Sequence, residues 1–206
     1  MSNRVTDSEI SCAKKYIEEL RRFVHDLDLP NDNKVLAASS CFAIAQEHHH
    51  AIVLLVELRL LAPAFSLVRA GFEAYIRGNW LSMCANDAQI EEFIKGEEPP
   101  KINCLIDQLD KHYQFGEDNS LSQFKKKAWK PMCAYTHTGG LHVQRRNTAD
   151  GIEANYSKEE VLEVIQFAEL FATFATIGVA VLADNVELVD QITEAFDQHH
   201  KLNAPV

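Results

Sequence analysis

Two segments of this chain carry polar side chains at spacings that could support chemistry. The first holds Arg69, Glu73 and Arg77 inside a strongly apolar stretch that reaches Trp80. At about 100° per residue, these side chains lie along one stripe of a helix. One interpretation is a pair of i,i+4 ion pairs, each worth about 0.2–0.5 kcal/mol on an exposed helix. The other is a cluster of guanidinium groups that faces an anionic ligand. Both stay open.

Two glycines within this helix favour the second interpretation. Gly71 and Gly78 each weaken a helix by about 0.8–1.0 kcal/mol relative to alanine. Glycine at such positions suits the close approach of a second helix. We therefore expect close packing here, with the charged stripe turned toward a cleft.

The second segment is a predicted loop over residues 135–146, rich in glycine, histidine and arginine. We expect His137 to act as a general acid or base near neutral pH, with Arg69 and Glu73 as its catalytic partners. The other expected ligand-binding residues are Arg77, Tyr135, Gly139, Gly140, His142, Arg145, Arg146 and His50. The arginines would hold phosphate or carboxylate, and the glycine pair would adopt positive φ and expose backbone amides. The alternative is a surface connection whose histidines bond only the backbone.

Three consecutive histidines, His48, His49 and His50, do not form a metal site. Adjacent helical residues point about 100° apart, so the three cannot hold one ion together. We expect His49 or His50 to turn inward, no metal and no cofactor. The histidines at positions 199 and 200 are expected in solvent. Neither a G-x-S-x-G sequence nor a phosphate-binding glycine loop is present, so covalent catalysis has little support.

Composition limits the classes of function. A chain of 206 residues with 47% hydrophobic content predicts one domain over residues 1–206. A formal charge of −10 excludes a broad nucleic-acid surface, although a local basic site remains possible near Lys125, Lys126, Lys127 and Lys130. Five scattered cysteines without a C-x-x-C pair favour a reducing cytoplasm. The apolar stretch 161–183 is interrupted by glutamate, glutamine and threonine, so we expect a buried helix and no membrane span.

Apolar periodicity predicts an all-α bundle of about seven or eight helices. An N-terminal helix covers about 7–27, a core bundle about 34–183, and a C-terminal helix about 186–199. Capping boxes start the first and the penultimate helix, at Thr6–Glu9 and Ser157–Glu160. Within the core, the expected helices cover about 34–60, 63–84, 87–95, 102–113, 120–134 and 158–182.

These two segments resemble a bacterial all-helical family of unknown function. Its pattern is an inward histidine region, then A-x-x-L-x-R-x-x-x-E-x-x-x-R-x-x-W-L, then Y-T-H-x-G-G with trailing arginines. The matching residues here are His49 or His50, Ala64, Leu67, Arg69, Glu73, Arg77, Trp80, Leu81, Tyr135, Thr136, His137, Gly139, Gly140, Arg145 and Arg146. The resemblance covers about residues 36–160 and brings no activity with it.

More distantly, the layout is similar to the HEPN-like helical bundles, named for higher eukaryotes and prokaryotes nucleotide-binding. That resemblance implies a homodimer and a metal-independent ribonuclease in phage defence or stress response. Its signature places an arginine four to six residues before a histidine, and this chain departs from it. Arg69 or Arg77 would have to reach His137 from a different helix. The alternative is a non-catalytic homodimeric module whose Arg-Glu-Arg stripe is structural. The helix carrying Phe167, Leu170, Phe171, Phe174 and Ile177 would then be the dimer surface, although it could equally be all core.

Overall fold

A computed structural model describes residues 4–114 and 120–202 of the chain. Within these ranges the fold is all-α, with one short antiparallel hairpin in which Asn147 pairs with Ile152. The helices are α1 (Asp7–Val24), α2 (Asn33–Glu57), α3 (Leu61–Met83), α4 (Asp87–Ile94), α5 (Ile102–Tyr113), α6 (Leu121–Thr136), α7 (Gly140–Gln144), α8 (Lys158–Leu182) and α9 (Val186–Leu202). The strands are β1 (Asn147–Thr148) and β2 (Gly151–Ile152).

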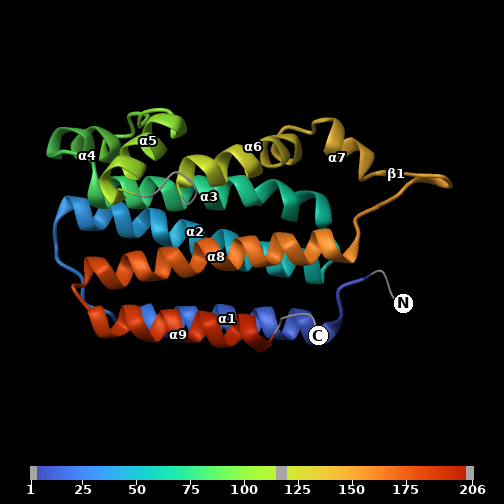
Figure 1. Ribbon diagram of the computed structural model, residues 1–206, viewed down its shortest axis with the longest axis horizontal. Coiled ribbons are helices and arrows are strands. Elements are labelled where there is room, and N and C mark those ends of the chain that lie inside the picture. Colours follow the sequence, from blue (N-terminus) through green and yellow to red (C-terminus); the bar gives the residue numbers. More distant parts are fainter. Residues whose placement is uncertain (1–3, 115–119, 203–206) are drawn as a thin grey trace.

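The helices form an elongated bundle in layers (Figure 1). Helices α2, α3 and α8 pack against one another at its centre. Helices α1 and α9 run side by side along one face, and α4, α5 and α6 cover the other. Helix α3 contacts α5 and α6 as well as α2 and α8, so the charged stripe on α3 belongs to a helix in contact on several sides.

Phe42 on α2 explains why glycines stand in two of the central helices. A Cβ atom built at Gly78 would lie 2.7 Å from the Phe42 ring, and one at Gly178 would lie 2.5 Å from it. The ring therefore occupies the space that side chains at both positions would need. Gly71 likewise faces His48, because a Cβ built at Gly71 would lie 3.3 Å from the Cβ of His48. The expected close helix packing at Gly71 and Gly78 is confirmed.

Helix α8 is long and apolar enough, by length and composition, to cross a membrane. In the bundle, 56% of its most apolar 18-residue window is buried, as a core helix would be. The predicted dimer surface on this helix is largely occupied by that packing. Phe171 is 4% exposed, whereas Phe174 remains 38% exposed. Phe171 also contacts Phe72 of α3 in an edge-to-face arrangement.

Most predicted elements are confirmed, including both capping boxes at Thr6–Glu9 and Ser157–Glu160. Two expectations were wrong. The predicted loop 135–146 contains the last turn of α6 and the short helix α7, which makes a ninth helix within the described residues. The hairpin was also missed, because two-residue strands are too short to show alternation.

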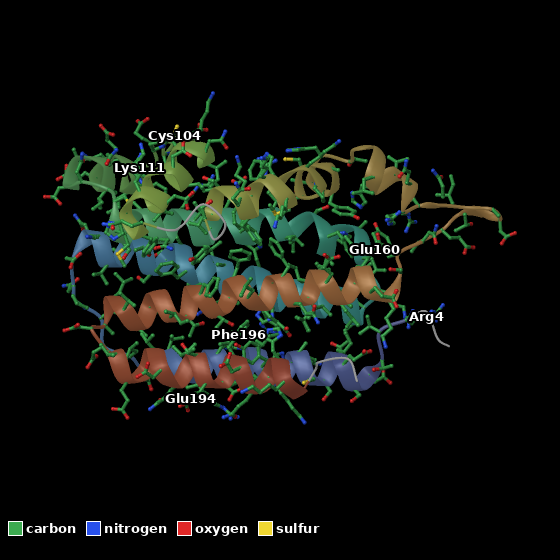
Figure 2. All side chains as sticks on the ribbon, viewed as in Figure 1. Arg4, Cys104, Lys111, Glu160, Glu194 and Phe196 are labelled. Atoms are coloured by element: carbon green, nitrogen blue, oxygen red, sulfur yellow. The ribbon has the colours of Figure 1, made fainter. Side chains whose placement is uncertain are left out.

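The C-terminal helix α9 is amphipathic and packs on α1 and α8. Phe196 lies between α8 and α9, whereas Glu194 lies on the outer side (Figure 2). His199 was expected in solvent, but only 8% of it is exposed. It faces the bundle one turn after Phe196, where its ring stacks on that of Tyr16 of α1.

Candidate functional site

Two stripes of polar side chains face each other across α3 and α6. On α3 they are Arg69, Glu73 and Arg77. On α6 they recur every four residues, so one side of the helix carries them all. They are Lys125, Trp129, Cys133 and His137, where His137 caps the C-terminal end of α6. We call these seven residues the α3–α6 cluster.

Arg69 is the side chain that joins the two stripes. Its Nε donates to Glu73 Oε1 at 2.7 Å, and its Nη1 lies 2.6 Å from His137 Nε2. Nη1 also donates to Cys133 Sγ at 3.6 Å, and the guanidinium carbon stands 4.6 Å from the Trp129 ring centroid. Because arginine carries only donors, His137 Nε2 accepts in this contact and the neutral ring carries its proton on Nδ1.

Glu73 binds both arginines of its own helix. Oε1 accepts from Arg69, and Oε2 accepts from Arg77 Nη2 at 2.9 Å. The side chains of Arg69, Glu73 and Arg77 are 22%, 15% and 33% exposed. The stripe is therefore neither a solvated surface nor a dry interior, and part of each side chain is in contact with solvent.

Trp129 brings a second cation to the cluster. Lys125 Nζ lies 4.6 Å from the centroid of the same ring that Arg69 covers. Lys125 also donates to Asn103 Oδ1, which places its ammonium group between α5 and α6. Two positive groups thus share one aromatic ring, an arrangement that cation–π attraction supports.

Hydrogen bonds between α3 and the end of α6 set the position of His137. Ser66 Oγ shares its proton between the carbonyls of Ala62 and Tyr135, both at 2.9 Å. Thr136 Oγ1 lies 2.9 Å from the carbonyl of Met132 and 3.2 Å from that of Ser66. His137 itself is exposed. The backbone at His137 is therefore held in place, while its imidazole ring is accessible to solvent.

The turn after His137 differs from the expected one. Thr138, and neither glycine, takes the left-handed conformation, with φ of 53°. The amide of Gly139 donates to the carbonyl of Ala134 at 2.7 Å, which closes α6 with a Schellman-type bond. Space favours glycine at position 139, because a Cβ there would lie 3.0 Å from Ala134 Cα. The prediction of positive φ at Gly139 and Gly140 was wrong.

His142 lies apart from the α3–α6 cluster. It is 7% exposed, and its Nδ1 lies 2.8 Å from the carbonyl oxygen of Tyr135. Its ring contacts those of Tyr135 and Tyr156, which both pack on Phe65. Burial raises the pKa of Tyr135. His142 and the Tyr135 ring therefore hold α7 onto the bundle, contrary to their expected role beside Arg69.

Of the two trailing arginines, which were expected to bind a ligand, Arg145 has a partner within the chain. Arg145 binds the carboxylate of Glu160, with Nε 2.7 Å from Oε1. Glu160 lies in the first turn of α8, where the hairpin joins that helix (Figure 2). Arg146 is exposed. Arg145 thus connects the end of α7 to α8, and its guanidinium group is already paired with Glu160.

Of the consecutive histidines, His49 turns inward. It is 2% exposed, and burial lowers its pKa to about 3. His50, the expected ligand-binding residue, is half-buried on α2. The side of α3 that faces α2 carries Gly71, roughly 200° round the helix from Arg69 and from Glu73. His49, which turns inward from α2, therefore does not reach the stripe of Arg69, Glu73 and Arg77.

Sequence reasoning missed Trp129, Cys133 and Ser66. The four-residue spacing from Lys125 to His137 could have indicated the first two, since it places them on the face of α6 that carries His137. Ser66 gave no such signal, because its role depends on the contact between α3 and the end of α6.

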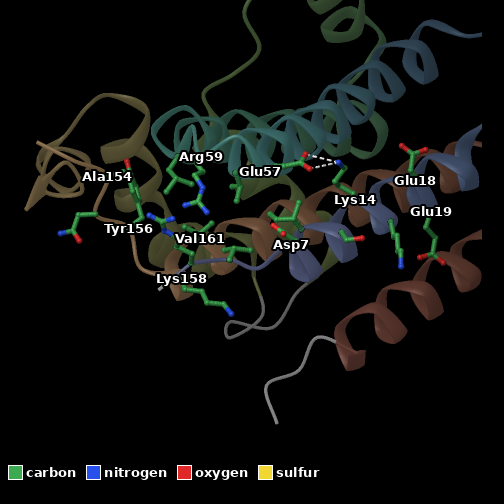
Figure 3. A pocket seen from close by; sticks show the side chains of 18 of the residues that line it. Asp7, Lys14, Glu18, Glu19, Glu57, Arg59, Ala154, Tyr156, Lys158 and Val161 are labelled. Carbon is green, nitrogen blue, oxygen red and sulfur yellow. Dashed lines mark hydrogen bonds and ion pairs between the residues drawn. The ribbon is translucent and has the colours of Figure 1, made fainter. Parts of the chain in front are cut away.

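A large hollow lies away from the α3–α6 cluster. It is an open cleft of about 1450 Å³ between α1, the end of α2 and the segment before α8 (Figure 3). Its walls carry both charges, and the Lys14–Glu57 pair at 3.0 Å spans part of it. None of the predicted site residues lines it. Among the described residues, no group of three or more His, Cys, Asp or Glu is placed to hold a metal ion.

Fold and site together define an all-helical protein with a polar cluster between two helices. Residues 42–204 match a family of unknown function, DUF6988, and the chain belongs to that family. No curated protein and no solved structure matches the chain.

Proposed function

We propose that the α3–α6 cluster binds a phosphate group of single-stranded RNA and that His137 transfers a proton in cleavage of that strand. The observation that carries the proposal is the Arg69 guanidinium, which holds Glu73 at 2.7 Å and His137 at 2.6 Å together. A phosphate that reaches Arg69 would lie beside an imidazole that can move a proton.

The charges of the cluster favour an anion. Arg69, Arg77 and Lys125 supply three cations, and Glu73 supplies one carboxylate. Arg69 and Lys125 are both near the Trp129 ring, although like charges repel. Each guanidinium has five N–H donors, so a bond to Glu73 leaves donors for phosphate oxygens.

The proposed reaction needs only the RNA and the cluster. The phosphate takes the Arg69 Nη1 donor and so frees His137 Nε2, which accepts the proton of a ribose 2′-hydroxyl. The 2′-oxygen forms a bond to the adjacent phosphorus. The bond from phosphorus to the 5′-oxygen breaks, and that oxygen leaves with a proton from solvent. Arg69 stabilises the charge that develops on the phosphate oxygens. The products are a 2′,3′-cyclic phosphate and a 5′-hydroxyl end.

A second candidate is a structural role for the stripe, and one observation favours it. Both Glu73 oxygens already bind arginines, at 2.7 and 2.9 Å, in a partly buried setting. In that case the ion pairs of Glu73 with Arg69 and Arg77 hold α3 rigid within a non-catalytic interaction module. Glu73→Gln would then lower thermal stability without any effect on a ligand.

The test uses the full chain and a short, labelled single-stranded RNA of mixed sequence, in the presence of EDTA. We expect wild type to bind the RNA and to yield ends with cyclic phosphate. His137→Ala should retain its melting temperature and lose cleavage by about a hundredfold or more, the size of a general acid–base contribution. Arg69→Gln should lose both binding and cleavage.

His25→Ala serves as the matched control, because His25 is exposed beyond the end of α1. It should bind and cleave as wild type does. RNA that remains intact and unbound with wild type would rule out the proposal. Cleavage that survives in His137→Ala would remove the histidine from the mechanism.

The proposal extends to biological context. A cytoplasmic, bacterial, HEPN-like ribonuclease in phage defence or stress response would use such a site. A homodimer would use the exposed remainder of the α2 and α8 surface, where Ile44 is 46% and Phe174 38% exposed. Sedimentation of wild type and Phe174→Asp tests that part separately, since RNA cleavage does not enter the measurement.

A further inference from the structure

A second group of reactive side chains lies on the opposite face of the bundle. Cys12 on α1, Glu169 on α8 and His199 on α9 meet where these three helices pack together. His199 Nδ1 stands 3.9 Å from Cys12 Sγ, and His199 Nε2 stands 3.1 Å from Glu169 Oε1. Glu169 and His199 are 3% and 8% exposed, whereas Cys12 is half-buried. Cys12 is therefore partly in contact with solvent, although the other two residues are enclosed.

The imidazole of His199 is held from two directions. Glu169 fixes one ring nitrogen, and the Tyr16 ring stacks on the imidazole face at 4.1 Å and 13°. Tyr16 is fixed in turn by Thr173, whose Oγ1 lies 2.7 Å from the tyrosine hydroxyl. Because Thr173 donates its only proton to the carbonyl of Glu169, the Tyr16 hydroxyl must be the donor. The orientation of His199 toward the thiol is thus set by packed groups.

A purely structural ion pair would not need the thiol. Replacing a buried pair by apolar residues is often neutral or stabilising, so Glu169 and His199 are not required to dock α9. The surrounding interface is apolar and includes Leu188, Ile192 and Ala172. A nucleophile, a base within reach of it and a third group that orients the base are the parts of an activated nucleophile.

We propose that Cys12 is a reactive thiol, activated by His199 and Glu169, and that its substrates are hydroperoxides. Acyl transfer is disfavoured because Cys12 lies inside α1, where backbone amides are paired within the helix and cannot serve as oxyanion donors. Attack on a peroxide needs only a thiolate and a proton for the leaving oxygen.

The step balances with the peroxide as oxidant. His199 Nδ1 takes the proton from Cys12 Sγ, and the sulfur attacks the terminal peroxide oxygen. A sulfur–oxygen bond forms and the oxygen–oxygen bond breaks, so the sulfur loses two electrons to the peroxide. The departing alkoxide, or hydroxide when the substrate is hydrogen peroxide, takes the proton from His199. The products are Cys12 sulfenic acid and an alcohol or water. One small thiol then condenses with the sulfenic acid to a mixed disulfide and water, and a second thiol restores the cysteine.

The other cysteines of the chain provide internal references for the test. Cys104 is exposed on α5, and Cys41 is 6% exposed in the core. The full chain is treated with hydrogen peroxide in the presence of dimedone, which traps sulfenic acid, and each site is followed by mass spectrometry. We expect adducts at Cys12 to form about tenfold faster than at Cys104, because reactivity follows the local activation of the thiol. Cys41 should stay unmodified.

Glu169→Gln and His199→Gln keep the side-chain volumes nearly constant and should each slow the reaction at Cys12 about tenfold, with the rate at Cys104 unchanged. Modification of Cys41 in either variant would reveal unfolding. In that case the test rests on the wild-type chain, in which the rate at Cys12 is compared with the rate at Cys104. Equal rates at Cys12 and Cys104 in wild type would overturn the proposal. So would a wild-type rate at Cys12 in a folded His199→Gln chain.

Discussion

Gly78 of α3 faces the ring of Phe42 on α2 so closely that a methyl group at Gly78 would lie 2.7 Å from two ring carbons. Phe42 is 1% exposed and cannot move into solvent without losing its packing. We therefore predict that Gly78→Ala lowers the free energy of unfolding by about 1–3 kcal/mol, the usual cost of overpacking a core. Denaturation in guanidinium chloride measures the change.

Gly140→Ala is the matched control for this substitution. Gly140 opens α7, and a Cβ there meets nothing within 4 Å. We expect a change near zero or a gain of up to about 1 kcal/mol, because alanine reduces the freedom of the unfolded chain. Equal effects at the two glycines would contradict the close contact with Phe42.

Glu160 has two structural roles in the first turn of α8. Its carboxylate completes the capping box with Ser157 and also binds Arg145 of the preceding segment. We predict that Glu160→Ala costs about 1–2 kcal/mol in unfolding free energy, whereas Glu160→Gln, which can still cap, costs less. The exposed neighbour Glu159 belongs to the same turn, and Glu159→Ala should cost less than Glu160→Ala if the contacts described here are responsible.

Thr138 carries the left-handed conformation that ends α6, with φ of 53°. This conformation is unfavourable for a threonine and common for glycine at the same position of a helix end. Thr138→Gly should therefore raise the unfolding free energy by about 0.5–1 kcal/mol, as measured by thermal melting. The same substitution inside α9, Thr193→Gly, should have the opposite sign, because glycine weakens a helix interior. A loss at position 138 would refute the assigned turn.

The buried His49 predicts a pH dependence of stability. Burial lowers its pKa from 6.5 to about 3 in the folded chain. Between these values the unfolded chain binds a proton that the folded chain does not, so stability falls as pH decreases from about 6.5 toward about 3. The slope for one group is at most about 1.4 kcal/mol per pH unit. Burial lowers the pKa of His48 and His200 as well, with the same sign.

Urea denaturation at a series of pH values measures this effect. His49→Leu should flatten the dependence between pH 6.5 and pH 5, whereas exposed His25, changed to Gln, should leave it as in wild type. A slope that is the same in His49→Leu and in wild type would show that His49 is not the responsible group.

Local sequence determined most of the helices of this protein. Capping boxes at Thr6 and Ser157 satisfy free amides within a few residues, so they can be recognised without any tertiary contact. Apolar periodicity likewise predicted the ends of long helices to within a few residues. It failed for α7, whose five residues contain too little of the 3.6-residue period to be distinguished from a loop.

The stripe of Arg69, Glu73 and Arg77 was also evident from spacing alone, because it lies on a single helix. Only tertiary structure decided what it faces. The contact between Arg69 and His137 joins residues on two helices, and it depends on how α6 packs on α3. The same packing brought Trp129 and Cys133 to the stripe. Other tertiary contacts placed His142 against the Tyr135 ring and Arg145 against Glu160 of α8. Residue spacing encodes which face of a helix a side chain occupies, whereas its partner depends on which helix the chain folds against that face.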